Sequence, residues 1–262
     1  MKAFHGKQAT KDFYIEKMKA HMAADELVRG HYWDPRTRTG CGVGCTLEIP
    51  NGENIHEQFE PELGIPRQVA FLEDYLFEKT PLDYYQAFPL AFLEAIPVGA
   101  DLSMIVPRFL VWLLIDEQDG VLRFADPLGK EVVILIAGLY QRLLDGGEVA
   151  DSEWAAASVA ASVAARTAAC AADRTAARAA ARDAASVADS VADSDTAWDA
   201  AWYAASAAAR TASRAAASPA ARAAVRDAAW DAATKRQAEK LLEVLCVAPV
   251  PVEVGSPERK QK

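Results

Sequence analysis

Histidine and cysteine residues gather at the start of the chain, where they could form a metal site. All four His and two of the four Cys lie within the first 56 residues. Cys41 and Cys45 are separated by Gly-Val-Gly, and zinc sites commonly present two thiolates a few residues apart on a turn. This spacing predicts zinc as the cofactor. Its candidate ligands are Cys41, Cys45, His21, His56 and His5.

The same residues support two other interpretations. Thiol catalysis needs a thiolate, a base and a group that orients the base. Cys45 follows two nearby glycines, and His21 with Asp25 four positions further on would share one face of a helix as an oriented base. Alternatively, these residues are ordinary free thiols and surface histidines. The sequence leaves all three interpretations open, and no catalytic residue is assigned.

The segment that contains both cysteines is predicted to be a long loop. Residues 31–60 are rich in Pro, Gly and Asn, which leaves room for one short strand around Cys45–Ile49. Before this segment, apolar residues at helical spacing predict a helix over Thr10–Arg29 that ends at Gly30. A loop of this length is uncommon inside a compact domain unless something pins it, and a bound ion would do so.

Four further helices are predicted after residue 64, each from apolar residues at helical spacing. Asp101 is expected to cap the third of these helices, and Pro89 and Pro107 are expected to bend or interrupt theirs. Residues 1–150 would then form an acidic helical domain, with 14 Lys and Arg against 23 Asp and Glu. The four predicted helices are Pro66–Lys79, Leu82–Ile96, Asp101–Ile115 and Gly129–Leu144.

Residues 151–247 are predicted to form an alanine-rich domain, in which residues 154–233 follow a four-residue alanine repeat. Alanine supplies 41 of the 90 residues from 151 to 240 and glycine is absent there, so helix is strongly favoured. Small side chains predict close packing of antiparallel helices, with breaks at the capping residues. The predicted helices are Ser152–Ala192, Asp195–Ala217 and Pro219–Leu245, followed by a disordered tail over 248–262. The sequence therefore predicts an all-α fold, an irregular helical domain followed by an alanine-rich bundle.

One column of the alanine repeat contains Trp and Arg residues, which are common anchors of protein-binding surfaces. This column predicts a partner-binding edge. The alternative is that the arginines form a solvated edge balanced by nearby Asp residues, while the tryptophans pack against the first domain. The candidate partner-binding residues are Trp198, Trp202, Arg210 and Arg214.

Charge and composition narrow the class of partner. The net charge is −9, and residues 151–262 are neutral, with 14 basic and 14 acidic side chains. A general nucleic-acid binder needs a cationic surface, so nucleic acid is not expected as the main partner. No apolar run reaches the length of a membrane span, and no signal-peptide core is present at the start. We therefore expect a cytoplasmic protein that binds a protein partner or a second copy of itself.

Five short motifs in residues 1–145 resemble a family of uncharacterised bacterial proteins. The resemblance implies that His5, His21, Cys41 and Cys45 belong to a shared polar set, to which His56 is added, whereas His31 falls outside it. It names no activity. The motifs are His5-Gly6, His21 with Asp25-Glu26, Gly40–Thr46, Glu62–Pro66 and Phe92–Asp101.

The alanine-rich part is similar in composition to helical regions of immunity proteins from bacterial polymorphic toxin systems. That resemblance implies a protein that binds and neutralises a toxin without catalysis. The sequence thus favours a non-enzymatic protein-interaction protein, whose Cys and His residues form either a structural zinc site or no site. The alternative is a Cys- or zinc-dependent enzyme with its site in residues 1–60 and the alanine-rich bundle as an accessory module. Phosphate-binding glycine loops, serine nucleophile elbows and H-E-x-x-H are all absent.

Overall fold

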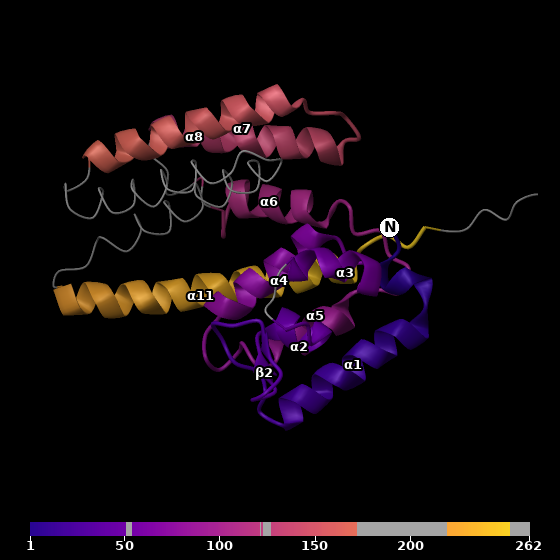
Figure 1. Cartoon of the computed structure of the whole chain (residues 1–262). Helices are drawn as coiled ribbons and strands as arrows, with labels where there is room; N and C mark the ends of the chain where they lie inside the picture. Colours follow the sequence, from indigo (N-terminus) through magenta and orange to yellow (C-terminus); the bar gives the residue numbers. More distant parts are fainter. Residues whose placement is uncertain (51–53, 121, 123–126, 172–218, 252–262) are drawn as a thin grey trace, which may run out of the picture. The chain divides into compact units, whose positions relative to one another are not determined.

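The computed structural model describes residues 1–50, 54–120, 122, 127–171 and 219–251 (Figure 1). Within these residues the chain forms nine α-helices, one 3-10 turn at Ala3–Gly6 (η1) and a single two-stranded sheet. The predicted all-α fold is therefore confirmed. None of the described helices is both long enough and apolar enough to cross a membrane.

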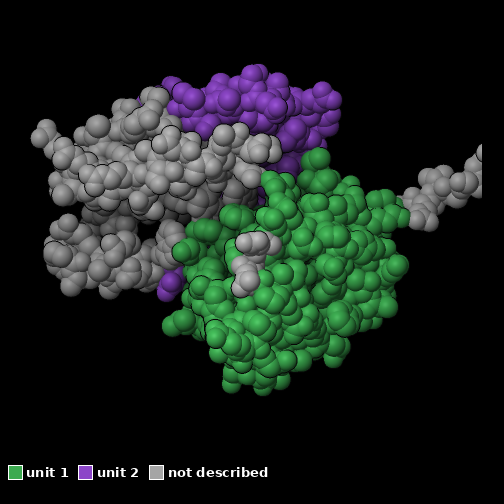
Figure 2. Space-filling model, viewed as in Figure 1, with its two compact units in different colours: residues 1–105, 238–262 green, residues 106–237 purple. Residues whose placement is uncertain are grey.

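The chain divides into two compact units, which Figure 2 shows in different colours. Unit 1 comprises residues 1–105 and 238–262, and unit 2 comprises residues 106–237. This division does not follow the boundary expected between residues 150 and 151. One reason is α11 (Pro219–Cys246), which begins in the alanine-rich part and ends in unit 1. Its last turns contain the buried Leu241 and Leu245 in place of alanine.

The first long helix is shorter than predicted. α1 spans Gln8–Ala23, whereas the apolar pattern predicted a helix up to Arg29. The helix ends early because Asp25 adopts a left-handed φ of 54° and the Glu26 N–H donates to the His21 carbonyl. The buried Leu27 then pairs with Gly40 in an isolated parallel bridge, so its apolar side chain belongs to the core without being helical.

The predicted loop over residues 31–60 contains more regular structure than expected. β1 (Trp33–Asp34) and β2 (Thr39–Gly40) form an antiparallel pair, and α2 (Gly42–Leu47) follows directly. The strand predicted over Cys45–Ile49 is wrong, because Cys45 lies inside α2. The Cys41 sulfur accepts a hydrogen bond from the Gly44 N–H, 3.4 Å away, and so caps this short helix.

The next three helices build most of the core of unit 1. α3 (Ile55–Leu63) begins within the segment predicted as loop and ends three residues beyond it, and α4 (Arg67–Lys79) agrees with the prediction to one residue. α5 (Phe88–Ala95) begins six residues later than predicted, because residues 82–87 form turns. Pro89 lies in its first turn, where a missing N–H costs little. Fully buried phenylalanines, each contributing about 1.5–3 kcal/mol by burial, fill this core: Phe4, Phe59, Phe77, Phe88 and Phe92.

The chain around residue 101 meets the end of α11. Asp101 does not cap a helix as predicted, because its carboxylate accepts the Ser103 N–H at 3.0 Å within a turn, while α6 (Ile105–Ile115) begins later. Pro107 falls in the first turn of α6 and does not interrupt it. The Asp101 N–H donates to the Pro249 carbonyl at 2.8 Å. The start of the tail predicted to be disordered is therefore held in unit 1, while residues 252–262 lie outside the described residues.

Unit 2 contains a helical hairpin. α7 (Pro127–Leu144) and α8 (Asp151–Ala171) lie side by side in Figure 1. The Tyr140 and Trp154 rings are in contact in a tilted arrangement, with 4.7 Å between centroids, and Arg142 forms an ion pair with Glu153 at 2.6 Å. Trp154 thus packs on the preceding helix. α11 begins at Pro219 as predicted, whereas the predicted helix over 195–217 lies outside the described residues.

Candidate metal centre

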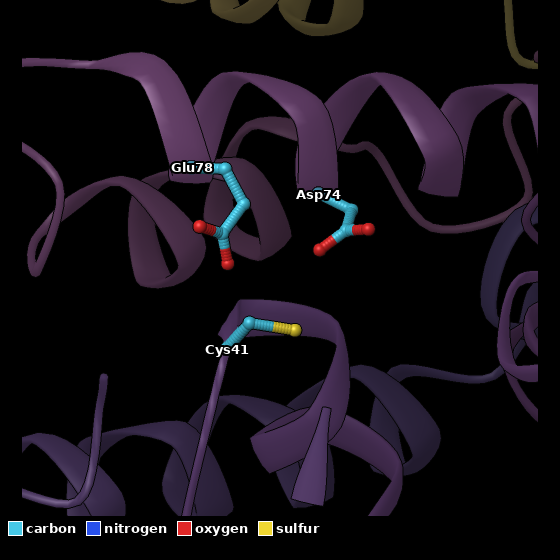
Figure 3. Close-up of side chains that lie close together, drawn as sticks. All are labelled: Cys41, Asp74 and Glu78. Atoms are coloured by element: carbon cyan, nitrogen blue, oxygen red, sulfur yellow. The ribbon is translucent and has the colours of Figure 1, made fainter. Parts of the chain in front are cut away.

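Three side chains with metal-ligating atoms meet between α2 and α4. Cys41 precedes α2, and Asp74 and Glu78 lie one turn apart on the same face of α4. One ligand atom from each residue lies within 4.8 Å of the others, and Figure 3 shows both carboxylates projecting toward Cys41. In the described part of the chain, this is the only group of three or more such residues that could hold a metal ion. We call it the Cys41 cluster.

Glycines bring α2 close enough to its neighbours to form this cluster. A Cβ atom at Gly44 would lie 1.4 Å from the Tyr32 carbonyl oxygen, and one at Gly40 would lie 1.9 Å from the same atom. The Cys41 N–H donates to the His31 carbonyl at 2.9 Å, which fixes the backbone at the start of α2. The glycines that flank the two cysteines therefore permit close packing on residues 31–33, and do not form an open loop around an ion.

Each of the three candidate ligands is also held by a donor outside the cluster. His56 Nε2 lies 3.0 Å from Asp74 Oδ2, and the Gly30 N–H donates to Glu78 Oε1 at 3.0 Å. The Cys41 sulfur accepts from the Gly44 N–H, as described above. Such outer hydrogen bonds orient the ligands of a metal and keep their remaining lone pairs directed at one point.

The electrostatics of the cluster are unfavourable without a cation. Burial raises the pKa of the Cys41 thiol far above its usual range, and the negative charge of Asp74 adds to this effect. Burial also raises the pKa of Tyr32 to about 12, again with a contribution from Asp74. Among the described residues, no Lys or Arg forms an ion pair with Asp74 or Glu78. A divalent cation would neutralise these groups and stabilise the thiolate.

Glu73 is a further acidic residue beside the cluster that the sequence analysis missed. Its side chain is 2% exposed, and neither carboxylate oxygen has a hydrogen-bond partner. Burial raises its pKa well above the usual value, and the charges of Asp74 and Glu78 raise it further. A sequence pattern could have found it, because Glu73 occupies a helical position between the buried apolar Val69 and Leu76.

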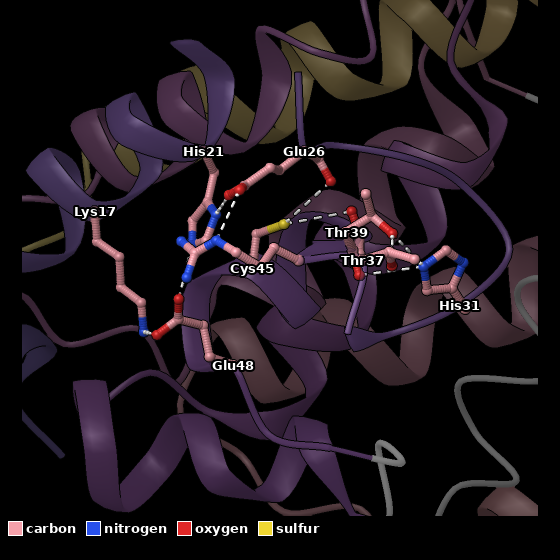
Figure 4. A network of polar contacts seen from close by, with 10 residues as sticks. Lys17, His21, Glu26, His31, Thr37, Thr39, Cys45 and Glu48 are labelled. Carbon is pink, nitrogen blue, oxygen red and sulfur yellow. Dashed lines mark hydrogen bonds and ion pairs between the residues drawn. The ribbon is translucent and has the colours of Figure 1, made fainter. Parts of the chain in front are cut away.

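His21 and Cys45 belong to a second polar cluster at the other end of α2, shown in Figure 4. The His21 imidazole lies between two carboxylates, with Nδ1 2.5 Å from Glu26 Oε2 and Nε2 3.3 Å from Glu48 Oε1. Lys17 pairs with Glu48 at 2.8 Å, and Arg38 pairs with Glu26 at 3.0 Å. We call these six residues the His21 cluster: Lys17, His21, Glu26, Arg38, Cys45 and Glu48. Asp25 was predicted as the partner of His21. Because α1 ends at Ala23, Glu26 instead pairs with the His21 imidazole.

Cys45 lacks the environment of a catalytic thiol. Its side chain is fully buried, and the sulfur donates to the Gly40 carbonyl at 3.4 Å. Burial raises its pKa to about 12, and the charge of Glu26 acts in the same direction. A nucleophilic cysteine needs the opposite, an exposed sulfur whose thiolate is stabilised by a nearby positive charge.

The structure does not bring the five predicted metal ligands together. Cys41 belongs to the Cys41 cluster and His56 contacts it through Asp74, whereas Cys45 and His21 lie at the His21 cluster. His5 Nε2 instead lies 3.0 Å from the Pro61 carbonyl oxygen. The predicted partner-binding residues Trp198, Trp202, Arg210 and Arg214 lie outside the described residues.

Three of the five motifs named in the sequence analysis meet around the N-terminal turn η1, namely His5-Gly6, Glu62–Pro66 and Phe92–Asp101. Ala3 exchanges backbone hydrogen bonds with residues 99 and 100, at 2.8 and 2.9 Å. Gly64 has a φ of 64°, and a Cβ atom there would lie 2.2 Å from the Lys2 carbonyl oxygen. These motif residues therefore have structural roles. The chain matches no family model, no curated protein and no solved structure.

Proposed function

We propose that unit 1 is a zinc-binding domain, and that the whole chain is a non-enzymatic protein that binds a protein partner. The convergence of Cys41, Asp74 and Glu78 to within 4.8 Å is the observation that supports the zinc site. A thiolate ligand favours zinc over magnesium or calcium, which prefer an all-oxygen environment. The proposal keeps zinc as the cofactor and Cys41 as a ligand, with two carboxylates in place of Cys45 and the predicted imidazole ligands.

A zinc ion in this place would have a structural effect. It would connect the start of α2 to the middle of α4, two segments more than 30 residues apart in the sequence. Metal binding that requires the folded arrangement of its ligands adds to the free energy of folding. The segment over 31–60, which was predicted to need something to pin it, would be held by this ion and by the glycine contacts described above.

The absence of catalysis is proposed from the state of the thiols. Cys45 was the candidate nucleophile, and it is buried as a thiol. We expect iodoacetamide to modify the exposed Cys246 in the native protein while Cys41 and Cys45 stay unmodified. Preferential labelling of Cys45 would instead support the alternative, a Cys-dependent enzyme.

Partner binding is proposed for the alanine-rich part. The described face of unit 2 exposes apolar side chains on α7 and α8, with Ile134 56% and Val159 64% exposed. The compositional resemblance to immunity proteins points to the same role. Affinity purification should compare the wild type with a variant in which Trp198 and Trp202 are serine. Selective loss of a protein, or of a second copy of this chain, would support the proposal, and an unchanged set of partners would contradict it.

The zinc site is tested by metal content and by cobalt substitution. We expect one zinc per chain in protein purified without a chelator, and a thiolate-to-cobalt charge-transfer band after exchange. Cys41→Ser should abolish the band while keeping a side-chain oxygen that can cap α2. Cys45→Ser is the matched control, because both cysteines are buried and lie four residues apart. A wild-type chain that takes up neither zinc nor cobalt would overturn the proposal.

A further inference from the structure

We propose that the metal centre keeps a fourth position open for water or a small anion, and that the Glu73 carboxyl group accepts a hydrogen bond from this fourth ligand. The inference rests on the proposed zinc site and adds to it. It assigns the site a class of ligand, namely water, hydroxide or a monodentate anion. Glu73 is here a positioning residue that does not bind the metal itself.

The number of protein ligands is the first observation. Zinc prefers four tetrahedral ligands, and sites with three protein ligands usually complete the shell with water. Three side chains of the described chain meet in the Cys41 cluster. His56 is the nearest further candidate, but its Nε2 is already 3.0 Å from Asp74 Oδ2 and it lies outside the group of mutually close atoms. We therefore assign His56 to the support of Asp74.

The place of Glu73 is the second, independent observation. A Cβ atom at Gly42 would lie 2.2 Å from Glu73 Oε1, so the carboxyl group lies directly against the residue that follows Cys41. Only glycine at position 42 allows this approach. The carboxyl group is also close enough to act electrostatically on Cys41, and both Asp74 and Glu78 act on it. Glu73 thus precedes Asp74 in α4, and its carboxyl group lies against the residue that follows Cys41.

The missing hydrogen bonds of Glu73 need a donor. Nearly all buried polar side chains in folded proteins have a hydrogen-bond partner, and an unpaired buried carboxyl group is costly. Both Glu73 oxygens lack one in the described structure. The neighbouring cysteine and carboxylates offer mainly acceptors once they bind a metal. A metal-bound water, whose O–H groups are strong donors, would supply the missing partner.

The side of the cluster on which the carboxylates lie is partly exposed to solvent. Cys41 and Glu73 are buried, but the Asp74 side chain is 14% exposed and the His56 side chain 18% exposed. The α2 side of the cluster is therefore its more buried side, and Asp74 and His56 form its less buried side. An open position of this kind is what a zinc ion needs in order to act as a Lewis acid, and a closed structural site lacks it.

Three variants of the full-length chain, together with azide as the probe, test the inference. Azide should change the visible spectrum of the cobalt-substituted wild type. Glu73→Leu should weaken zinc binding by about 10–100-fold in a chelator competition, the usual effect of losing an outer-shell partner. Glu73→Gln should keep most of the affinity, because its amide oxygen still accepts a hydrogen bond. Glu48→Leu, the same change at the other end of α2, should bind zinc like the wild type.

Other outcomes would overturn the inference. If azide leaves the cobalt spectrum unchanged, or if Glu73→Leu binds zinc as tightly as the wild type, the fourth position is closed or does not involve Glu73. If His56→Gln reduces zinc affinity as much as Asp74→Asn does, His56 is the fourth ligand. Retention of the charge-transfer band in Glu73→Leu shows that the variant is folded around Cys41. Failure of the wild type to bind metal would instead refute the zinc site itself.

Discussion

The two ends of α2 contain polar clusters that differ in how their charges are compensated. In the His21 cluster, Lys17 and Arg38 each pair with a carboxylate, and the imidazole lies between Glu26 and Glu48. Every carboxylate of that cluster has a cationic or imidazole partner within the protein. In the Cys41 cluster, the thiol and two carboxylates approach one another, and only Asp74 has an imidazole partner, His56. Glu78 accepts a backbone N–H, and Glu73 beside the cluster has no hydrogen-bond partner.

This difference separates a structural cluster from a candidate binding site. A natural chain usually satisfies its buried polar groups, and local exceptions tend to occur where a ligand completes the arrangement. Glu73, beside the Cys41 cluster, is such an exception, whereas the His21 cluster has a partner for each of its carboxylates. A high local density of histidine and cysteine did not distinguish them. The clusters are distinguished by whether their acidic groups have cationic partners within the protein.

Removing His21 should have the largest effect on stability. Its imidazole is 3% exposed, and His21→Ala would leave two carboxylates facing a buried gap. Breaking such a buried pair lowers the free energy of unfolding by about 3–5 kcal/mol. We expect a decrease of about 3 kcal/mol for His21→Ala, because Glu48 still pairs with Lys17. Urea unfolding measures this decrease. The control is His31→Ala, which replaces an exposed histidine and should leave the free energy of unfolding almost unchanged. If Asp74→Asn in chelator-treated protein were equally destabilising, the contrast between the clusters would be wrong.

Zinc should stabilise the protein through the Cys41 cluster alone. At free zinc of about 100 times Kd, binding to the folded state raises the unfolding free energy by about 2.7 kcal/mol. Thermal or urea unfolding with and without chelator should show this difference for the wild type and for Cys45→Ser. Cys41→Ser should show almost none of it. Equal stabilisation of both variants would place the metal elsewhere.

Glu73→Met should stabilise the metal-free protein. Replacing an unpaired buried carboxyl group by an apolar side chain of similar size removes its desolvation cost, for a gain of about 1–3 kcal/mol near pH 7. Because the folded-state pKa of Glu73 is raised, its penalty is absent below about pH 4.5 and grows as the pH rises toward the folded-state value. The gain should therefore shrink at pH 4. The exposed Glu16→Met should produce no such pH-dependent gain.

The sequence predicted the helices better than it predicted the site. α4 and α7 agree with the apolar pattern to within two residues, and Pro219 begins α11 as expected. The pattern failed where apolar residues are buried outside helices, as at Leu27, and where a sulfur atom caps a helix, as at Cys41. Apolar periodicity indicates which side chains are buried, but it does not indicate whether the backbone at those positions is helical.

The candidate site was predicted only in part, because its members come from distant segments. The Cys-x3-Cys spacing selected Cys41, and the histidine count selected His56, but neither pattern indicated Asp74 or Glu78. Acidic residues one turn apart are common on exposed helices, so their chemistry depends on what packs against them. The early end of α1 also changed the partner of His21, which sequence spacing alone had assigned to Asp25.

The pH dependence of the two clusters should have opposite signs, and Glu26 tests this with the smallest expected effect. Burial tends to raise the pKa of Glu26, but hydrogen bonds from His21 and Arg38 outweigh it and lower the pKa below the usual 4.5. Its contribution to stability is therefore present above about pH 4.5 and is lost as the pH falls through the folded-state value. Between pH 6 and pH 3, Glu26→Gln should lose less stability than the wild type in chelator-treated protein. An acid loss that is unchanged in Glu26→Gln would mean that the His21 cluster does not stabilise its carboxylates, and the contrast with Glu73 would fail.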